Sequence, residues 1–153
     1  MPQAPEELAL NDAMTKLETA LLTPLVSGEL DTWVETVLQA ADDLGPLLRQ
    51  YADVVTHPQY AQIGSADPEL LTHVQQLTAE DAKLALEYEA FRRSLDEIVK
   101  RVPLVGKHES KVKERRAQIE AEGVAMILHI RKQQAGASTW LSEAFYRDRG
   151  QGD

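Results

Sequence analysis

The chain contains no cysteine, which excludes disulfide bonds, thiolate metal ligands and cysteine nucleophiles. Aromatic residues are scarce, at 5% of the sequence, and there is little of the Val/Ile/Thr alternation that is typical of strands. Hydrophobic residues make up 43% of the 153 positions, which is enough for a folded domain with its own core. These totals favour one helical domain over residues 1–153.

Positive charge is also in short supply, since 16 Lys and Arg stand against 25 Asp and Glu and the formal net charge is −9. Nucleic acids are bound through clustered positive charge, so this balance argues against a nucleic-acid partner. No apolar run is long enough to cross a bilayer, and the acidic N-terminus lacks a signal-peptide core. We therefore expect a cytoplasmic protein without a membrane partner.

The signatures of common catalytic sites are absent as well. The sequence has no GxSxG, no HExxH and no Glu-x-x-His pair of the kind found in carboxylate di-iron bundles. Gly106-Lys107 lacks the preceding glycine spacing of a phosphate-binding loop. The sequence thus argues against an enzyme.

What the sequence does contain is a set of long apolar patterns at alternating steps of three and four residues. Such spacing places one apolar stripe along a helix, and that stripe must be buried against other helices. The most regular stripe consists of Val74, Leu77, Asp81, Leu84, Tyr88, Phe91, Leu95, Ile98 and Val102.

The patterns predict helices over residues 5–22, 29–56, 68–102 and 108–146. Amphipathic helices joined by short or moderate connections form up-down-up-down bundles. The predicted fold is therefore an all-α, antiparallel up-down-up-down four-helix bundle. The glycine-rich tail, from about residue 148 to residue 153, is expected to be flexible.

Prolines and acids mark the expected helix boundaries. Asp67-Pro68-Glu69 is a typical helix start, with an acidic N-cap followed by proline in the first turn. Gly45-Pro46 lies inside the second helix and predicts a kink there. His57-Pro58 is expected to end the second helix, so that residues 57–66 form a loop.

Tyr51, Asp81 and Gln133 occupy positions where the stripes require apolar side chains. If their helices are antiparallel neighbours, Asp81 and Gln133 both lie about 20 Å from a common bundle end, so we expect them to meet. Tyr51 lies about 8 Å from its helix end and can belong to another layer. This buried polar layer either fixes the helix register or forms a ligand site.

A metal site is the second interpretation of the polar residues. Glu122 and His129 lie seven residues apart and share a helix face. Together with Asp81 they offer an alternative set of iron ligands. Without thiolates, and with only 4 histidines scattered along the chain, the sequence predicts no tightly held transition metal.

Basic residues cluster in one segment, between residues 100 and 116, where seven Lys and Arg stand against two Glu. Its last part contains Lys111, Lys113, Arg115 and Arg116. Such a run either covers a solvated helix end or docks an acidic protein partner. Both interpretations remain open from the sequence.

The chain also resembles hemerythrin-like (HHE) domains, in the aromatic end of the second helix at Tyr51, in Glu80-Asp81, and in the segment IRKQQAGASTWLSEAFY. The resemblance covers most of residues 29–153 and implies a four-helix bundle with inward-pointing histidine and carboxylate ligands for non-haem iron. In such domains histidines are expected near Tyr51, Asp81 and Gln133, and this chain has none there. The resemblance therefore implies a bundle that has lost the usual diiron site.

These observations predict a non-catalytic binding or regulatory bundle without a cofactor. The alternative is a divergent hemerythrin-like protein that binds iron, and through it oxygen or NO, with Asp81, Glu122 and His129. A structural bundle that forms a homodimer is a further alternative.

Overall fold

The structure is a computed structural model that describes residues 3–24, 28–101 and 105–151. Side chains are described throughout these ranges except at 101, 105–111 and 147–151. The described residues are helical almost throughout and include no β-strand. The predicted all-α class is therefore confirmed.

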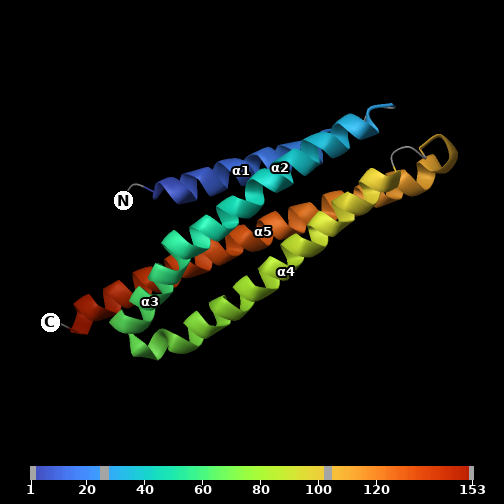
Figure 1. Cartoon of the computed structure of the whole chain (residues 1–153). Helices are drawn as coiled ribbons and strands as arrows, with labels where there is room; N and C mark the ends of the chain where they lie inside the picture. Colours follow the sequence, from blue (N-terminus) through green and yellow to red (C-terminus); the bar gives the residue numbers. More distant parts are fainter. Residues whose placement is uncertain (1–2, 25–27, 102–104, 152–153) are drawn as a thin grey trace.

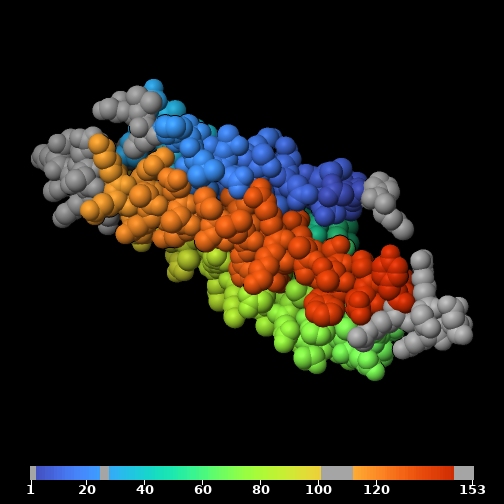
Figure 2. Space-filling model, turned by 180° about the vertical axis from the view of Figure 1, so that it is seen from behind, coloured from blue at the N-terminus to red at the C-terminus, as the bar shows by residue number. Residues whose placement is uncertain are grey.

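Long helices form the body of the molecule, which is elongated (Figure 1). Helix α1 packs along α2, and α4 packs along α5, while further contacts join α1 to α5 and α2 to α4. Seen from behind, α5 lies between α1 and α4 on the surface (Figure 2). The four long helices are α1 (Pro5–Leu22), α2 (Leu30–Tyr51), α4 (Leu71–Arg101) and α5 (Val105–Gln151).

Residues 57–66 are helical, so the loop that we predicted there was wrong. They form α3 (His57–Ala66), which continues from α2 through a π-helical turn (Ala52–Thr56). Within this turn the N–H of His57 donates to the carbonyl of Ala52, five residues back. Pro58 therefore falls in the first turn of a new helix, where a missing N–H costs little. Burial of Tyr60 and Ile63 stabilises this short helix.

Two further features were predicted from prolines and acids, a kink at Gly45-Pro46 and a helix start at Asp67. Helix α2 continues through Gly45-Pro46 as one helix, as predicted, and the kink expected at this point stays a prediction; a π-helical turn follows at Ala52–Thr56. Asp67 acts as an N-cap as predicted, since its side chain accepts a hydrogen bond from the N–H of Glu69 at 3.1 Å. A 3₁₀ turn, Pro68–Leu70, then leads into α4.

The last helix is longer than the pattern indicated. Helix α5 begins at Val105 and not at residue 108, and its backbone is helical as far as Gln151. The expected tail is thus helical over its first part, and residues 152–153 lie outside the described residues.

The core consists of two clusters of buried side chains. The larger cluster lies between α1, α2, α4 and α5 and includes Leu17, Val37, Leu44 and Phe91. Close approach of α5 depends on Gly123, because a Cβ there would lie 2.5 Å from Cδ1 of Leu21. The smaller cluster joins α3 to the ends of α4 and α5 through Tyr60, Ile63, Leu70, Leu77, Ala137 and Ala144.

No helix in the described part of the chain combines the length and the apolar character that a membrane span requires.

Candidate functional site

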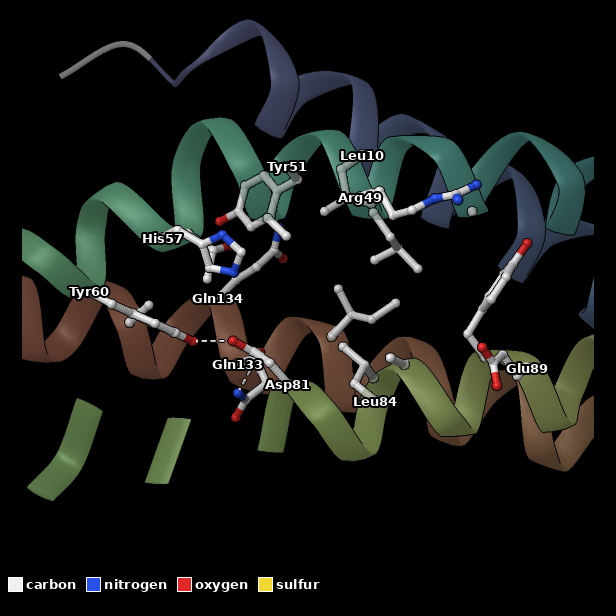
Figure 3. Close-up of a pocket in the computed structure, with 18 residues that line it drawn as sticks. Leu10, Arg49, Tyr51, His57, Tyr60, Asp81, Leu84, Glu89, Gln133 and Gln134 are labelled. Atoms are coloured by element: carbon white, nitrogen blue, oxygen red, sulfur yellow. Dashed lines mark hydrogen bonds between the residues drawn. The ribbon is translucent and has the colours of Figure 1, made fainter. Parts of the chain in front are cut away.

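A cavity of about 370 Å³ lies inside the bundle where α2 passes into α3 (Figure 3). Its walls come from α2, the π-helical turn, α3, α4 and α5, with Leu10 contributed by α1. Most of the lining is apolar, and the volume is at the lower end of the range of about 300–1,000 Å³ that is usual for small-molecule sites. We therefore treat this cavity as the candidate functional site.

Three side chains form a hydrogen-bonded group on one side of the cavity. Tyr60 donates its hydroxyl to Oδ2 of Asp81 at 2.6 Å, and Gln133 donates its amide to Oδ1 of Asp81 at 2.9 Å. The same amide nitrogen donates to the carbonyl of Leu77 at 2.9 Å. We call Tyr60, Asp81 and Gln133 the polar triad. It joins α3, α4 and α5 in one group, and Figure 3 shows it facing Tyr51 across the cavity.

The contact expected between Asp81 and Gln133 from their depths in the bundle is thus present. Gln133 is buried and Asp81 is half-buried. Tyr51 is buried and lines the same cavity, but its neighbour is Gln134 and it forms no described hydrogen bond with Asp81 or Gln133. The predicted residues therefore surround one cavity without forming one continuous network.

The environment of the cavity raises the pKa of its tyrosines. Burial is the main cause for Tyr60, and the neighbouring Asp81 carboxylate raises its pKa further. Burial likewise raises the pKa of Tyr51, with smaller contributions from Glu7 and Asp81, and that of Tyr88. These hydroxyls remain protonated at neutral pH and can donate hydrogen bonds.

The apolar part of the cavity lies beyond the polar triad. Leu10, Leu84 and Ile130 are buried side chains that line it. Tyr88 closes one wall, and its hydroxyl donates to the carbonyl of Ala41 at 2.7 Å. Gly45 allows that bond, because a Cβ at position 45 would collide with the Tyr88 hydroxyl. The cavity therefore combines an apolar body with a polar side.

Three polar side chains at the edge of the cavity are exposed, which indicates an opening to solvent. Arg49, His57 and Glu89 line the cavity and are all exposed. In Figure 3 the guanidinium of Arg49 extends away from Asp81. Nδ1 of His57 lies 3.8 Å from Oδ1 of Asp53, one turn earlier in the chain.

The residues proposed as alternative iron ligands have separate partners. Asp81 belongs to the polar triad, while Glu122 lies 3.7 Å from Arg115. His129 contacts Glu87 through Nδ1 at 2.8 Å and Glu80 through Nε2 at 3.0 Å. Within the part of the chain that the structure describes, no group of three or more His, Asp or Glu side chains has an arrangement that could hold a metal ion.

His129 instead joins α5 to α4. Its two ring nitrogens lie beside the carboxylates of Glu87 and Glu80, so one side chain of α5 contacts two side chains of α4. Lys83 also bonds to Glu80, at 2.9 Å, and is the main cause of the lowered pKa of that carboxyl group, with His129 adding to it. The sequence pattern had paired His129 with Glu122, on its own helix, because facing residues on another helix are not visible from spacing.

Two of the basic residues proposed to dock a partner are engaged within the chain. Arg115 bonds to Ser94 and Glu97, each at 3.0 Å. Arg116 bonds to the carbonyl of Thr23 at 3.1 Å and lies near Glu120 and the ring of Trp33. Lys113 is exposed, and the side chain of Lys111 lies outside the described residues. The docking of an acidic partner here stays a prediction.

The sequence pattern missed several residues of the cavity, above all Tyr60, His57 and Gln134. Tyr60 and His57 were missed because Pro58 and Gly64 suggested a loop. The available signal was the spacing of Tyr60 and Ile63, which together with a proline in the first turn is compatible with a short helix. Gln134 lies beside the stripe of α5 and carried no signal of its own.

Comparison of the chain with protein-family models, curated proteins and solved structures found no match. The class of this protein is therefore described by its fold and its candidate site. It is an all-α protein with an internal cavity and a polar triad on one side of that cavity.

Proposed function

We propose that this protein is a non-catalytic binding module that holds a small organic molecule in the cavity between α2, α3, α4 and α5. The observation that carries the proposal is the combination of a cavity of about 370 Å³, a mostly apolar lining and a group of converging polar side chains on one side. Binding sites for small molecules have this composition, because apolar walls supply affinity and a few polar groups orient the ligand.

The arrangement of the helices supports this proposal. We infer that neighbouring long helices run antiparallel, up-down-up-down, because their contacts follow opposite residue orders. Between α4 and α5, Ser94 contacts Arg115 whereas Asp81 contacts Gln133. Contacts between α1 and α5 follow the same rule, with Asn11 beside Gln134 and Thr23 beside Arg116. In such a bundle, ligand sites are built in the core from facing helices.

The hydrogen bonds of the polar triad support binding rather than catalysis. Asp81 already accepts bonds from Tyr60 and Gln133, which hold its carboxylate in one orientation. Neither a nucleophile with an adjacent base nor a convergent set of metal ligands is described in the cavity. The residues can therefore recognise a ligand, and they offer no group poised to transform it.

A neutral fluorescent probe tests this proposal. Phenylnaphthylamine brightens in an apolar site, so titration should give a saturable increase with the unmodified chain. Leu84→Trp places a larger side chain into the cavity and should weaken probe binding strongly. The matched control is Leu86→Trp, because Leu86 is 66% exposed on the same helix and does not line the cavity.

Circular dichroism shows whether each variant remains helical. If Leu84→Trp unfolds the chain through overpacking, Ala137→Leu narrows the cavity from α5 by a smaller change. Equal probe binding by the folded cavity variants and by Leu86→Trp would contradict the proposal, and so would the absence of saturable binding to the unmodified chain.

Other interpretations from the sequence stay predictions. The resemblance to hemerythrin-like domains rests on pattern, and the separate partners of Asp81, Glu122 and His129 give the iron alternative no supporting observation. Solution mass would test a homodimer. Cell fractionation would test the cytoplasmic location.

A further inference from the structure

Among the described residues, the Asp81 carboxylate has no counter-charge. Tyr60 and Gln133 donate neutral hydrogen bonds to it, and within the described part of the chain it forms no ion pair with Lys, Arg or His. Removing a carboxylate from water is costly, and neutral donors compensate for only part of that cost. Folding of the chain has already removed the Asp81 carboxylate from water. A cation that enters the cavity is therefore attracted by the carboxylate without a second cost of desolvating it.

The Arg and His side chains at the edge of the cavity do not supply this charge. Arg49 extends away from Asp81 in Figure 3, and His57 is exposed and placed beside Asp53. Glu89, which also lies at the edge, is an acid like Asp81. The formal net charge of −9 also attracts cations to the protein and repels anions.

The surroundings of Asp81 indicate the rest of the ligand. Tyr60 belongs to the polar triad and Tyr51 faces the triad across the cavity, and aromatic rings attract organic cations. Beyond them, Leu10, Leu84 and Ile130 provide an apolar wall of fixed, buried side chains. A ligand that matches both parts has a positively charged end and an apolar body.

We infer that the cavity selects small organic ammonium compounds, with the ammonium group on the Asp81 carboxylate and an aromatic or aliphatic body against Leu10, Leu84 and Ile130. This inference rests on the proposed function, because it assigns a ligand class to the same cavity. It adds charge selectivity, which the proposed function does not require.

Three probes with the same body test the charge selectivity. At neutral pH phenylbutylamine is a cation, phenylbutanol is neutral and phenylbutanoate is an anion. Titration calorimetry with the unmodified chain should show the amine binding about ten-fold tighter than the alcohol, because hydrogen bonds to charged groups are the stronger class. The carboxylate should bind weakest.

Asp81→Asn should abolish the preference for the amine over the alcohol. The matched control is Asp96→Asn, which removes the same charge from the same helix but affects an exposed carboxylate paired with Arg92, outside the cavity. This control should keep the preference, which separates a local effect of Asp81 from the attraction exerted by the net charge.

The outcomes separate the two proposals. If the amine and the alcohol bind equally, or if Asp81→Asn keeps the preference, the ammonium inference is overturned while a binding cavity remains. If none of the three probes binds, both the inference and the proposed function are overturned. The ranking of probes on the unmodified chain requires no variant, so it decides the matter even if Asp81→Asn fails to fold.

Discussion

Tyr60 donates its hydroxyl to the Asp81 carboxylate at 2.6 Å, and this bond connects the short helix α3 to the first half of α4. Both residues line the cavity. Because Tyr60 lies on a helix that follows directly from α2, the bond also fixes the wall that α2 and α3 form around that cavity. The tyrosine thus links the stability of the fold to the shape of the site.

Tyr60→Phe tests this link, since it removes the hydroxyl and keeps the ring. The change should reduce the free energy of unfolding by about 1–2 kcal/mol, because one oxygen of a half-buried carboxylate loses its donor. Urea unfolding measures the effect. Tyr146→Phe is the control, since Tyr146 is 71% exposed, and it should stay within about 0.5 kcal/mol of the unmodified chain. Equal effects of the two changes would contradict a structural role of the bond.

The second prediction concerns the contact between Asp81 and Gln133. Asp81→Leu leaves the Gln133 amide with one hydrogen bond fewer and should cost about 1–3 kcal/mol. Combining it with Gln133→Leu should cost less than the sum of the two single changes, because apolar side chains fit a core position. Urea unfolding of the single and double variants gives the coupling energy. Strict additivity would show that the two side chains do not interact.

The third prediction concerns close helix packing at Gly123. Alanine is the better helix former by about 1 kcal/mol, yet its Cβ would overlap Leu21 and approach Phe91. Gly123→Ala should therefore destabilise the chain by about 1–3 kcal/mol. At Gly136, on the same helix, the nearest atom to a Cβ would be Cδ2 of Leu77 at 3.1 Å, so Gly136→Ala should cost less. A thermal unfolding series that ranks the two in the opposite order would refute the packing argument.

The fourth prediction concerns pH. Lys83 is the main cause that lowers the pKa of Glu80 from its ordinary value of 4.5, and His129 adds to the effect. A carboxyl group with a lowered pKa in the folded state stabilises that state above the ordinary pKa, and the contribution is lost as the pH falls through the lowered value. The unmodified chain should therefore lose stability relative to Glu80→Gln as the pH falls below about 4.5. Urea unfolding of both chains across that range measures it, and a constant difference would contradict the assignment.

The sequence was sufficient for the parts of the fold that depend on a regular stripe. The spacing along Leu77, Leu84, Phe91 and Leu95 identified α4, because an amphipathic helix must bury one face. The depth of Asp81 and Gln133 also predicted their contact, since rise per residue is nearly constant in a helix. These features follow from local geometry.

The features that depend on contacts between distant segments could not be predicted in this way. Helix α3 is short and contains Pro58 and Gly64, so its stability comes from burial against α4 and α5 rather than from propensity. The placement of His129 between Glu80 and Glu87 likewise depends on how α5 is rotated against α4. The spacing of residues along one helix does not show how that helix is rotated relative to its neighbour.

The most direct test of the central claim is an amide NMR titration of the unmodified chain with phenylbutanol, a neutral probe whose binding does not depend on the ammonium inference. A ligand in the cavity should shift the amide signals around Ala52, Ala85 and Ala137, which lie in three different walls. Signals around Ile119 and Val37, two residues of the larger core cluster that do not line the cavity, should change little. Saturable shifts confined to the cavity walls are the predicted result. No saturable shifts, or shifts centred elsewhere on the bundle, would contradict the account.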